Sequence, residues 1–279
     1  MPKIYCHQEN KQNITMAQIV LTRPLGQSMR LGELLAQQLP ELKQIQLPLL
    51  SIVPNESPQD AKRLQELLPN IHLAVFVSPN AIECTMRLLK ADWPTTIPIA
   101  VVGGGSVEAL ERRGITVDNG YQIYYPKEPE NWDSEGLWAE LKKASVHWAN
   151  QHILFLKGAG GRAWLSEQLL REGDKIHHLE TYRRVPLSKD APVWQLLKTV
   201  SPEETACLMT SSEGVRHMTD VLKEMQPWGQ EWLNLATMIC SHPRIAQTAK
   251  ELGFKKVECC NAGDNQLVLA SQRWIQQLK

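Results

Sequence analysis

Residues 157–162, Lys-Gly-Ala-Gly-Gly-Arg, combine three glycines and two cations in one short segment. Glycine lets a ligand come close to the backbone, and the free N–H groups at a helix start attract anions. The four apolar residues at 153–156 predict a buried strand before this segment, and a helical pattern follows from Trp164. The segment therefore lies where a strand gives way to a helix, which is where open α/β sheets bind ligands.

Hydroxyl, amide or glycine residues follow several other predicted strands. These turns are Thr22-Arg23-Pro24, Ser78-Pro79-Asn80, Gly103-Gly104-Gly105-Ser106, Thr210-Ser211-Ser212 and Ser241-His242-Pro243. Ser78, Asn80, Ser211 and Ser212 have the chemistry of helix N-caps whatever else they do. The carboxyl ends of parallel strands meet at one edge of a sheet, so these turns also predict a ligand site rich in N–H and O–H donors.

The composition is that of a soluble globular protein of one large or two ordinary domains. The chain has 279 residues, of which 43% are hydrophobic and 22% are charged, and its 30 basic residues balance its 30 acidic ones. This balance gives no general attraction to nucleic acid or to a membrane, and we expect neither as a partner. No apolar run approaches the ~20 residues of a membrane span.

The cysteines and histidines predict neither a disulfide framework nor a metal site. The six cysteines have no Cys-x-x-Cys spacing and the eight histidines have no metal-ligand spacing. Scattered thiols fit a reducing cytoplasm, which is the localisation we expect. Residues 1–15 are polar and lack the apolar core of a secretory signal, so they are expected to form a disordered extension.

Strands alternate with helices along the chain, which predicts an α/β fold with parallel sheets. Two halves match in permuted order: residues 153–173 match 19–39, residues 77–82 match 210–215, and residues 100–114 match 239–253. The permutation predicts two flavodoxin-like domains, one of them discontinuous. The expected division is 16–47 with 187–279 as domain 1, 48–181 as domain 2, and antiparallel linker strands near 47–53 and 181–186. A short strand is expected near 115–117, followed by a polar loop at 121–131.

Three segments resemble one enzyme family: Ile19-Val-Leu-Thr-Arg23-Pro24, Leu156-Lys-Gly-Ala-Gly-Gly-Arg162 and Glu180-Thr-Tyr182-Arg-Arg184. Together with the turns at 77–80 and 210–212, they are similar to the uroporphyrinogen-III synthase family. Residues 241–254 and 261–265 look like its bacterial branch. The resemblance covers nearly the whole chain from Met16 and implies two α/β domains joined by a two-stranded linker.

The resemblance implies a lyase of haem biosynthesis that closes hydroxymethylbilane, a linear tetrapyrrole with eight carboxylates, to uroporphyrinogen III. The last pyrrole, ring D, is inverted, water is lost and no cofactor is used. The implied partners are the bilane and, transiently, the deaminase that makes it. A monomer is expected.

The resemblance also implies a role for Tyr182 as the general acid at the hydroxymethyl group. The cations Arg23, Lys157 and Arg162 are expected to bind substrate carboxylates. The expected N–H and hydroxyl donors to substrate are Ser78, Asn80, Gly103, Gly104, Ser106, Gly158, Ser211, Ser212 and Ser241.

Two other functions remain open from the sequence. Residues 158–163 fit the loose dinucleotide pattern G-x-G-x-x-A, and Glu180 lies near the end of a later strand, as in a dinucleotide-dependent oxidoreductase. A two-lobed protein that binds a small molecule without reacting it would also fit the two-domain prediction.

Overall fold

A computed structural model describes residues 17–144, 150–161 and 163–278 of the chain. The chain divides into two compact units, which are called unit 1 and unit 2 here. Within the described residues, unit 1 holds 17–50 and 186–278, and unit 2 holds 51–185. The two crossing points fall in the segments where the sequence predicts the linker strands. The predicted disorder of residues 1–15 lies outside the described residues.

Unit 1 is built on a parallel sheet of five strands in the order β11-β10-β9-β1-β2. The strands are β1 (Gln18–Leu21), β2 (Lys43–Gln46), β9 (Thr205–Met209), β10 (Thr237–Cys240) and β11 (Lys256–Cys259). The helices are α1 (Leu25–Gln38), α7 (Pro192–Leu197), α8 (Ser212–Glu224), α9 (Trp228–Leu235), α10 (Pro243–Glu251) and α11 (Asp264–Leu278), with a short 3-10 helix, η3 (Pro202–Glu204).

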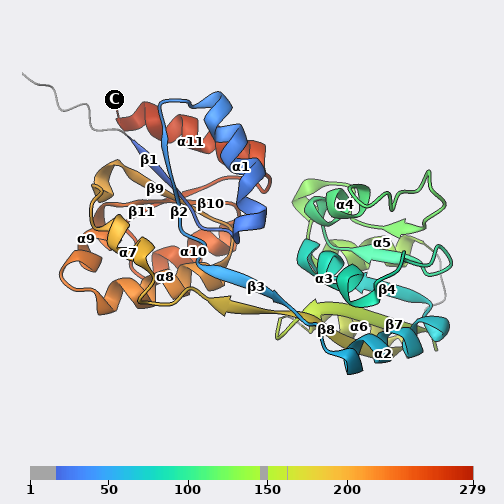
Figure 1. The fold of residues 1–279 in the computed structure, drawn as a ribbon. Helices are drawn as coiled ribbons and strands as arrows, with labels where there is room; N and C mark the ends of the chain where they lie inside the picture. Colours follow the sequence, from blue (N-terminus) through green and yellow to red (C-terminus); the bar gives the residue numbers. More distant parts are fainter. Residues whose placement is uncertain (1–16, 145–149, 162, 279) are drawn as a thin grey trace, which may run out of the picture. The chain divides into compact units, whose positions relative to one another are not determined.

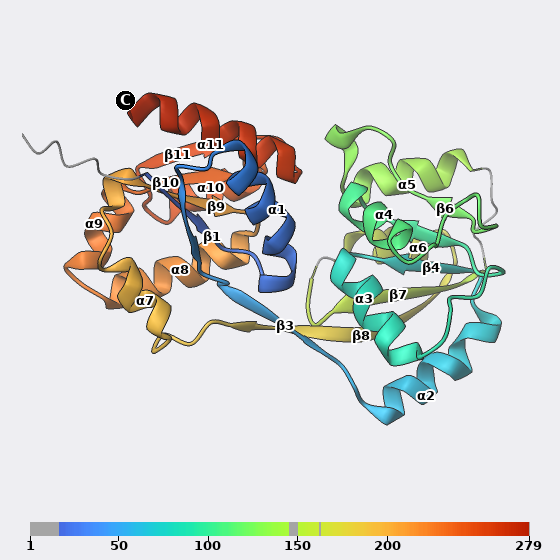
Figure 2. The ribbon, with the colours of Figure 1, turned by 45° about the horizontal axis from the view of Figure 1, so that its top comes forward.

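Helices cover both faces of the unit 1 sheet. Ile19 and Leu21 of β1 pack on the core with α1 and α11, whereas Val20 packs on the core with α8, α9 and α10. Figures 1 and 2 show α1 and α11 side by side on one face. Because both faces are covered, every residue of β1 is buried, and Ile19 to Leu21 form an unbroken apolar run rather than an alternating one.

Unit 2 contains a sheet of six strands in the order β3-β8-β7-β4-β5-β6. The strands are β3 (Leu50–Pro54), β4 (Leu73–Phe76), β5 (Ile99–Val101), β6 (Ile123–Tyr124), β7 (His152–Gly158) and β8 (Lys175–Pro186). The helices are α2 (Pro58–Leu67), α3 (Pro79–Leu89), α4 (Gly104–Glu111), α5 (Ser134–Lys143) and α6 (Trp164–Arg171), with the 3-10 helices η1 (Leu68–Asn70) and η2 (Pro129–Asn131).

The faces of the unit 2 sheet carry separate cores. Phe76 and Leu156 pack with α2, α3 and α4, whereas Val75 and Phe155 pack with α5 and α6. The pairs among β4, β5, β6, β7 and β8 are all parallel. Figure 2 shows the long strand β8 running beside β3. This topology confirms the predicted class of two parallel-sheet α/β domains.

The two sheets confirm the permuted repeat. From one edge, unit 1 reads β11-β10-β9-β1-β2 and unit 2 reads β6-β5-β4-β7-β8. Thus β7 and β8 of unit 2 occupy the positions of β1 and β2, and β4 to β6 occupy those of β9 to β11. The sequence matches pair the same elements, so the chain builds one flavodoxin-like strand order twice from different starting points.

The linker consists of β3 and the end of β8. The Asn55 N–H donates to the Thr181 carbonyl at 2.8 Å, and the Leu187 N–H donates to the Leu49 carbonyl at 2.9 Å. The residue numbers rise on one segment as they fall on the other, so the two segments run antiparallel.

The strand expected near 115–117 is wrong. These residues form turns after α4, and Val117 is 67% exposed. Gly120 has a φ of +86°, and Asn119 Nδ2 donates to the Gly114 carbonyl at 2.6 Å, so the connection continues before the edge strand begins. That strand is β6, which lies within the segment predicted to be a loop.

Candidate functional site

Each sheet has a topological switch point, where successive strands begin to be added on the other side of the first one. In unit 1 it lies between β1 and β9, and in unit 2 between β4 and β7. Arg23 and Ser211 follow the first pair of strands, and Ser78 and Ala159 follow the second. Ligands of parallel α/β sheets bind at such points, so the sequence-predicted residues lie where the fold favours binding.

A β-bulge aims Tyr182 at the switch point of unit 2. Lys157 pairs with Glu180, but the next residue, Gly158, pairs with Tyr182, so β8 has one extra residue here. The Ala159 N–H donates to the Tyr182 carbonyl at 2.9 Å. The bulge interrupts the alternation of the strand and leaves both Thr181 and Tyr182 buried.

Gly158 provides the space for the Tyr182 ring. A Cβ atom on Gly158 would lie 2.6 Å from Tyr182 Cζ, 2.7 Å from Cε2 and 3.0 Å from the hydroxyl oxygen. These distances are far shorter than van der Waals contact. The sequence predicts that Gly158 contacts a ligand, but in the structure the side of Gly158 where a side chain would be faces the tyrosine.

The Tyr182 hydroxyl contacts two polar side chains of unit 2. Its oxygen lies 3.0 Å from Ser78 Oγ and accepts a hydrogen bond of 3.1 Å from Arg184 Nη2. The Arg184 guanidinium carbon also lies 5.4 Å from the centre of the tyrosine ring. Tyr182 is 2% exposed, Ser78 is half-buried and Arg184 is exposed, so the ring is buried while its polar end lies next to surface groups.

Arg184 is absent from the set of residues predicted from the sequence. The signal that could have found it is its spacing from Tyr182, because residues two apart on a strand project from the same face. An arginine there can reach back along the strand to a phenol oxygen.

Ser78 is a helix N-cap, as predicted. Its Oγ accepts a hydrogen bond of 3.2 Å from the Ala81 N–H at the start of α3, in addition to its contact with Tyr182. Asn80 lies in the first turn of the same helix and is half-buried.

Trp132 covers the glycine turn after β5. A Cβ atom on Gly103 would lie 3.1 Å from Trp132 Cβ, and one on Gly104 would lie 2.3 Å from Cη2 of the indole. Ser106 is 2% exposed. The turn that the sequence assigns to substrate donors is therefore packed against an aromatic side chain.

Lys157 is half-buried on β7, and its carbonyl accepts a hydrogen bond of 3.3 Å from the Thr181 hydroxyl. Burial, followed by the nearby Lys157 ammonium, lowers the pKa of His178. Arg162, the second cation of the glycine segment, lies outside the described residues.

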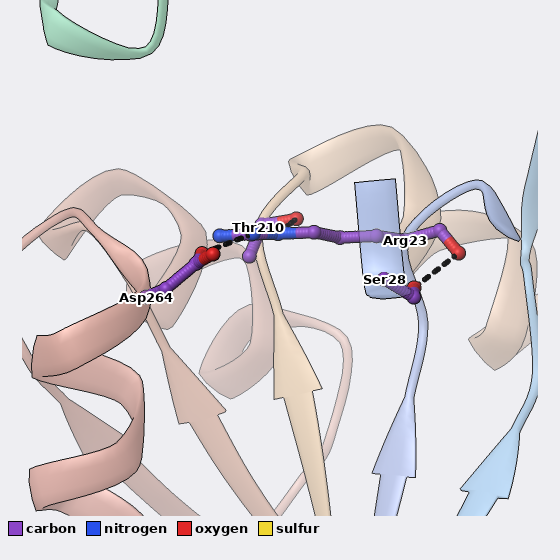
Figure 3. Close-up of polar contacts among 4 residues, drawn as sticks. All are labelled: Arg23, Ser28, Thr210 and Asp264. Carbon is purple, nitrogen blue, oxygen red and sulfur yellow. Dashed lines mark hydrogen bonds and ion pairs between the residues drawn. The ribbon is translucent and has the colours of Figure 1, made fainter. Parts of the chain in front are cut away.

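Arg23 lies in a polar network at the switch point of unit 1 (Figure 3). Its Nη1 donates to Asp264 Oδ1 at 2.5 Å, and its Nε contacts Thr210 Oγ1 at 3.4 Å. Ser28 Oγ donates to the Arg23 carbonyl at 3.1 Å. The side chains of Arg23 and Asp264 are 18% and 19% exposed. The carboxylate that Arg23 binds in this structure is therefore an internal one, at the start of α11, where the helix dipole also favours an anion.

The remaining predicted serines of unit 1 follow β9 and β10. Ser211 is the N-cap of α8 and accepts a hydrogen bond of 3.2 Å from the Gly214 N–H. Ser212 Oγ lies 3.2 Å from Thr248 Oγ1, and Ser241 is 8% exposed. Ser211 thus confirms the predicted capping role, whereas Ser212 lies inside the first turn of the helix.

The model of the HemD uroporphyrinogen-III synthase family matches residues 33–268. The chain belongs to the uroporphyrinogen-III synthase family. It is 28% identical over 258 residues to the uroporphyrinogen-III synthase of Salmonella typhimurium and 26% identical to that of Escherichia coli. In both cases the match covers 90% of this chain and 98% of the relative.

Two solved uroporphyrinogen-III synthases share the fold. A mutant of the Thermus thermophilus enzyme is similar with a TM-score of 0.60 at 14% identity, covering 94% of this chain and 99% of that one. The Helicobacter pylori protein is similar with a TM-score of 0.58 at 15% identity, covering 92% and 100%. With these relatives, the oxidoreductase and simple-binder alternatives are not favoured. The dinucleotide hypothesis also places a ligand in the space beside Gly158, but the Tyr182 ring fills that space.

The described part of the chain offers neither a helix that could span a membrane nor a cluster of metal ligands. None of the described helices combines the length and apolar character that a membrane span requires. Among the same residues, no group of three or more His, Cys, Asp and Glu side chains is arranged to hold a metal ion.

Asp174 is a buried acid that lies away from the switch point, just before β8. It is 5% exposed, and its Oδ1 accepts a hydrogen bond of 3.3 Å from the Gln151 N–H, while Oδ2 has no partner among the described residues. Burial raises the pKa of Asp174 to about 6, and the nearby Glu172 adds to this. The acid is therefore uncharged in the fold at pH values where it is ionised in the unfolded chain.

We expect Asp174→Asn to stabilise unit 2 by about 2 kcal/mol at pH 7, because the folded protein no longer suppresses an ionisation. Below a pH of about 4 both states of the wild type are protonated, so the gain should vanish. It should grow as the pH rises from about 4 to 6 and then stay constant. Urea unfolding at several pH values measures this, and a difference that does not change with pH would contradict the assignment.

Proposed function

We propose that this chain closes hydroxymethylbilane to uroporphyrinogen III, with inversion of ring D and loss of water, as a lyase of haem biosynthesis. Membership of the uroporphyrinogen-III synthase family supports the reaction. The observation that carries the chemistry is the Tyr182 hydroxyl, held between Ser78 and Arg184 at the switch point of unit 2. The reaction leaves the oxidation state unchanged, so it needs no redox cofactor.

In this proposal Tyr182 is the general acid. Its proton goes to the leaving hydroxyl of the bilane, the carbon–oxygen bond breaks, and water departs to leave an azafulvenium cation. Ring D attacks this cation through a spirocyclic intermediate, and the proton lost at the end of closure can return to the tyrosine oxygen. General acids of this kind typically contribute ~10²–10⁴-fold to a rate.

The proposed substrate contacts are divided by unit. In unit 2, Ser78, Asn80, Lys157 and the backbone around Gly158 offer donors and one cation to substrate carboxylates. Gly103, Gly104 and Ser106 are proposed to contribute only backbone N–H groups, because the Ser106 side chain is buried and Trp132 packs against the two glycines.

In unit 1, the proposed contacts are Ser211, Ser212, Ser241 and Arg23. A substrate carboxylate would compete with Asp264 for Arg23. Arg162 remains a proposed carboxylate ligand. The proposal also includes a monomer in the cytoplasm that receives the reactive bilane in transient contact with the deaminase.

The test is a coupled assay that generates hydroxymethylbilane in place and separates the oxidised uroporphyrin isomers. Without a synthase the bilane closes to the symmetric isomer I, so a shift to isomer III establishes the activity. We expect Tyr182→Phe to lower turnover by roughly 100-fold, the lower end of what a general acid contributes, because it removes the proton but keeps the ring. Isomer I alone from folded wild-type protein would overturn the proposed function, and full activity of Tyr182→Phe would overturn only the role of Tyr182.

A further inference from the structure

The interactions of the Tyr182 hydroxyl point to a second residue in the same step. Arg184 Nη2 lies 3.1 Å from the phenolic oxygen, and its guanidinium carbon lies 5.4 Å from the ring centre. We propose that Arg184 is a positioning residue for Tyr182: it orients the phenolic proton and stabilises the negative charge that develops on the oxygen. This inference rests on the proposed function and deepens it.

The donors and acceptors around the hydroxyl determine where its proton points. A guanidinium only donates, so the Tyr182 oxygen must accept the bond from Arg184. Ser78 Oγ accepts the Ala81 N–H with one lone pair and lies 3.0 Å from the Tyr182 oxygen, where either hydroxyl can be the donor. In the proposed arrangement Ser78 donates as well, so the phenol accepts from both side chains and its own O–H is left for the substrate.

The same geometry favours departure of the proton. As the proton leaves, charge builds on an oxygen that already faces a permanent cation and a hydroxyl donor. Preorganised donors aimed at developing charge are among the strongest catalytic effects in proteins. Arginine suits this position because its guanidinium is always protonated and its planar donors keep a fixed geometry.

The rest of the Tyr182 segment is held without Arg184. The Ala159 N–H fixes the Tyr182 carbonyl, the Asn55 N–H fixes the Thr181 carbonyl, and the space beside Gly158 holds the ring. Arg184 itself is exposed. Its replacement should therefore leave the fold intact, so that a change in activity reports on the hydroxyl.

The experiment is a double-mutant cycle in the isomer III assay with Arg184→Gln and Tyr182→Phe. We expect Arg184→Gln alone to lower kcat by about 10-fold with a change in KM below about 3-fold, and Arg184→Lys to recover part of the loss. In the Tyr182→Phe background, Arg184→Gln should change kcat by less than about 2-fold, because no phenolic proton is left to orient.

Arg183→Gln is the matched control. It removes the same charge one residue earlier, from an exposed position on the opposite face of the strand, and should keep wild-type kcat.

Two results would overturn the inference while the proposed function stands: an equal loss from Arg184→Gln with and without the Tyr182 hydroxyl, or a loss that appears only in KM. Either would make Arg184 a substrate ligand or a structural residue. Thermal unfolding of each variant separates misfolding from catalysis, and Arg184→Lys serves if the glutamine variant does not fold. Wild-type protein that yields isomer I alone would instead overturn the proposed function, and with it the inference.

Discussion

Gly158→Ala should lower turnover at least as much as Tyr182→Phe and destabilise unit 2 by about 3 kcal/mol. The new methyl group would meet the Tyr182 ring at 2.6 Å, and Tyr182 is only 2% exposed. Backbone strain does not contribute, because Gly158 is outside the set of glycines with positive φ. The ring must therefore shift, and its hydroxyl must leave Ser78 and Arg184. Urea unfolding and the isomer III assay measure the two effects.

A double-mutant cycle assigns these losses to the ring. In a Tyr182→Ala background the obstructing atoms are absent, so Gly158→Ala should cost less than about 1 kcal/mol there. The same cost in both backgrounds would show that Gly158 is needed for another reason, such as close approach of a ligand. Stability would then fall little in the wild-type background, while KM for the bilane would rise.

The fold was predictable because its signals are local and repeated. Buried parallel strands give apolar runs such as 153–156 and 73–77, and a helical pattern follows each of them. The permuted matches then fix which strands of the two sheets are equivalent. The edge strand of the unit 2 sheet was not predictable, since β6 has only two residues and lies inside a polar segment.

The candidate site was predictable only in part, for a physical reason. Strand exits such as Ser78 and Ser211 are found from the sequence because capping and strand ends are local properties. The bulge that pairs Gly158 with Tyr182, and the reach of Arg184 back to the hydroxyl, depend on the register between β7 and β8. A shift of one residue in a register changes which side chains meet, and no local pattern determines it.

Gly158 and Gly104 show most clearly what local sequence patterns fail to predict. Sequence reasoning treats a glycine at a strand exit as room for a ligand, since small residues let an anion approach the backbone. At Gly158 and Gly104 the room is taken by Tyr182 and Trp132, which lie far away in the sequence. A glycine here is therefore explained either by close approach of a ligand or by the space that an aromatic side chain needs, and substitution can distinguish the two.

Gly104→Ala provides the sharper comparison, because its neighbour Gly105 is a built-in control. A Cβ atom on Gly104 would meet the indole of Trp132 at 2.3, 2.5 and 2.9 Å, whereas one on Gly105 would meet only Pro79 Cγ at 3.7 Å. Both glycines lie in the first turn of α4. We expect Gly104→Ala to destabilise unit 2 by about 3 kcal/mol and Gly105→Ala to be neutral or to stabilise it by up to ~1 kcal/mol.

The cause of the stability loss in Gly104→Ala shows whether this glycine turn makes room for Trp132 or binds substrate. If Gly104 is needed because a side chain there would clash with Trp132, then Trp132→Ala should abolish most of the stability loss caused by Gly104→Ala in urea unfolding. Trp132→Ala is expected to destabilise the protein by itself. If the turn instead donates its N–H groups to a substrate carboxylate, Gly104→Ala should raise KM with little loss of stability. A rigid indole cannot yield at 2.3 Å as a flexible side chain could, so the structure favours the first result. The glycines of this edge would then act in the reaction mainly by placing aromatic side chains, with Tyr182 as the one that carries the proton.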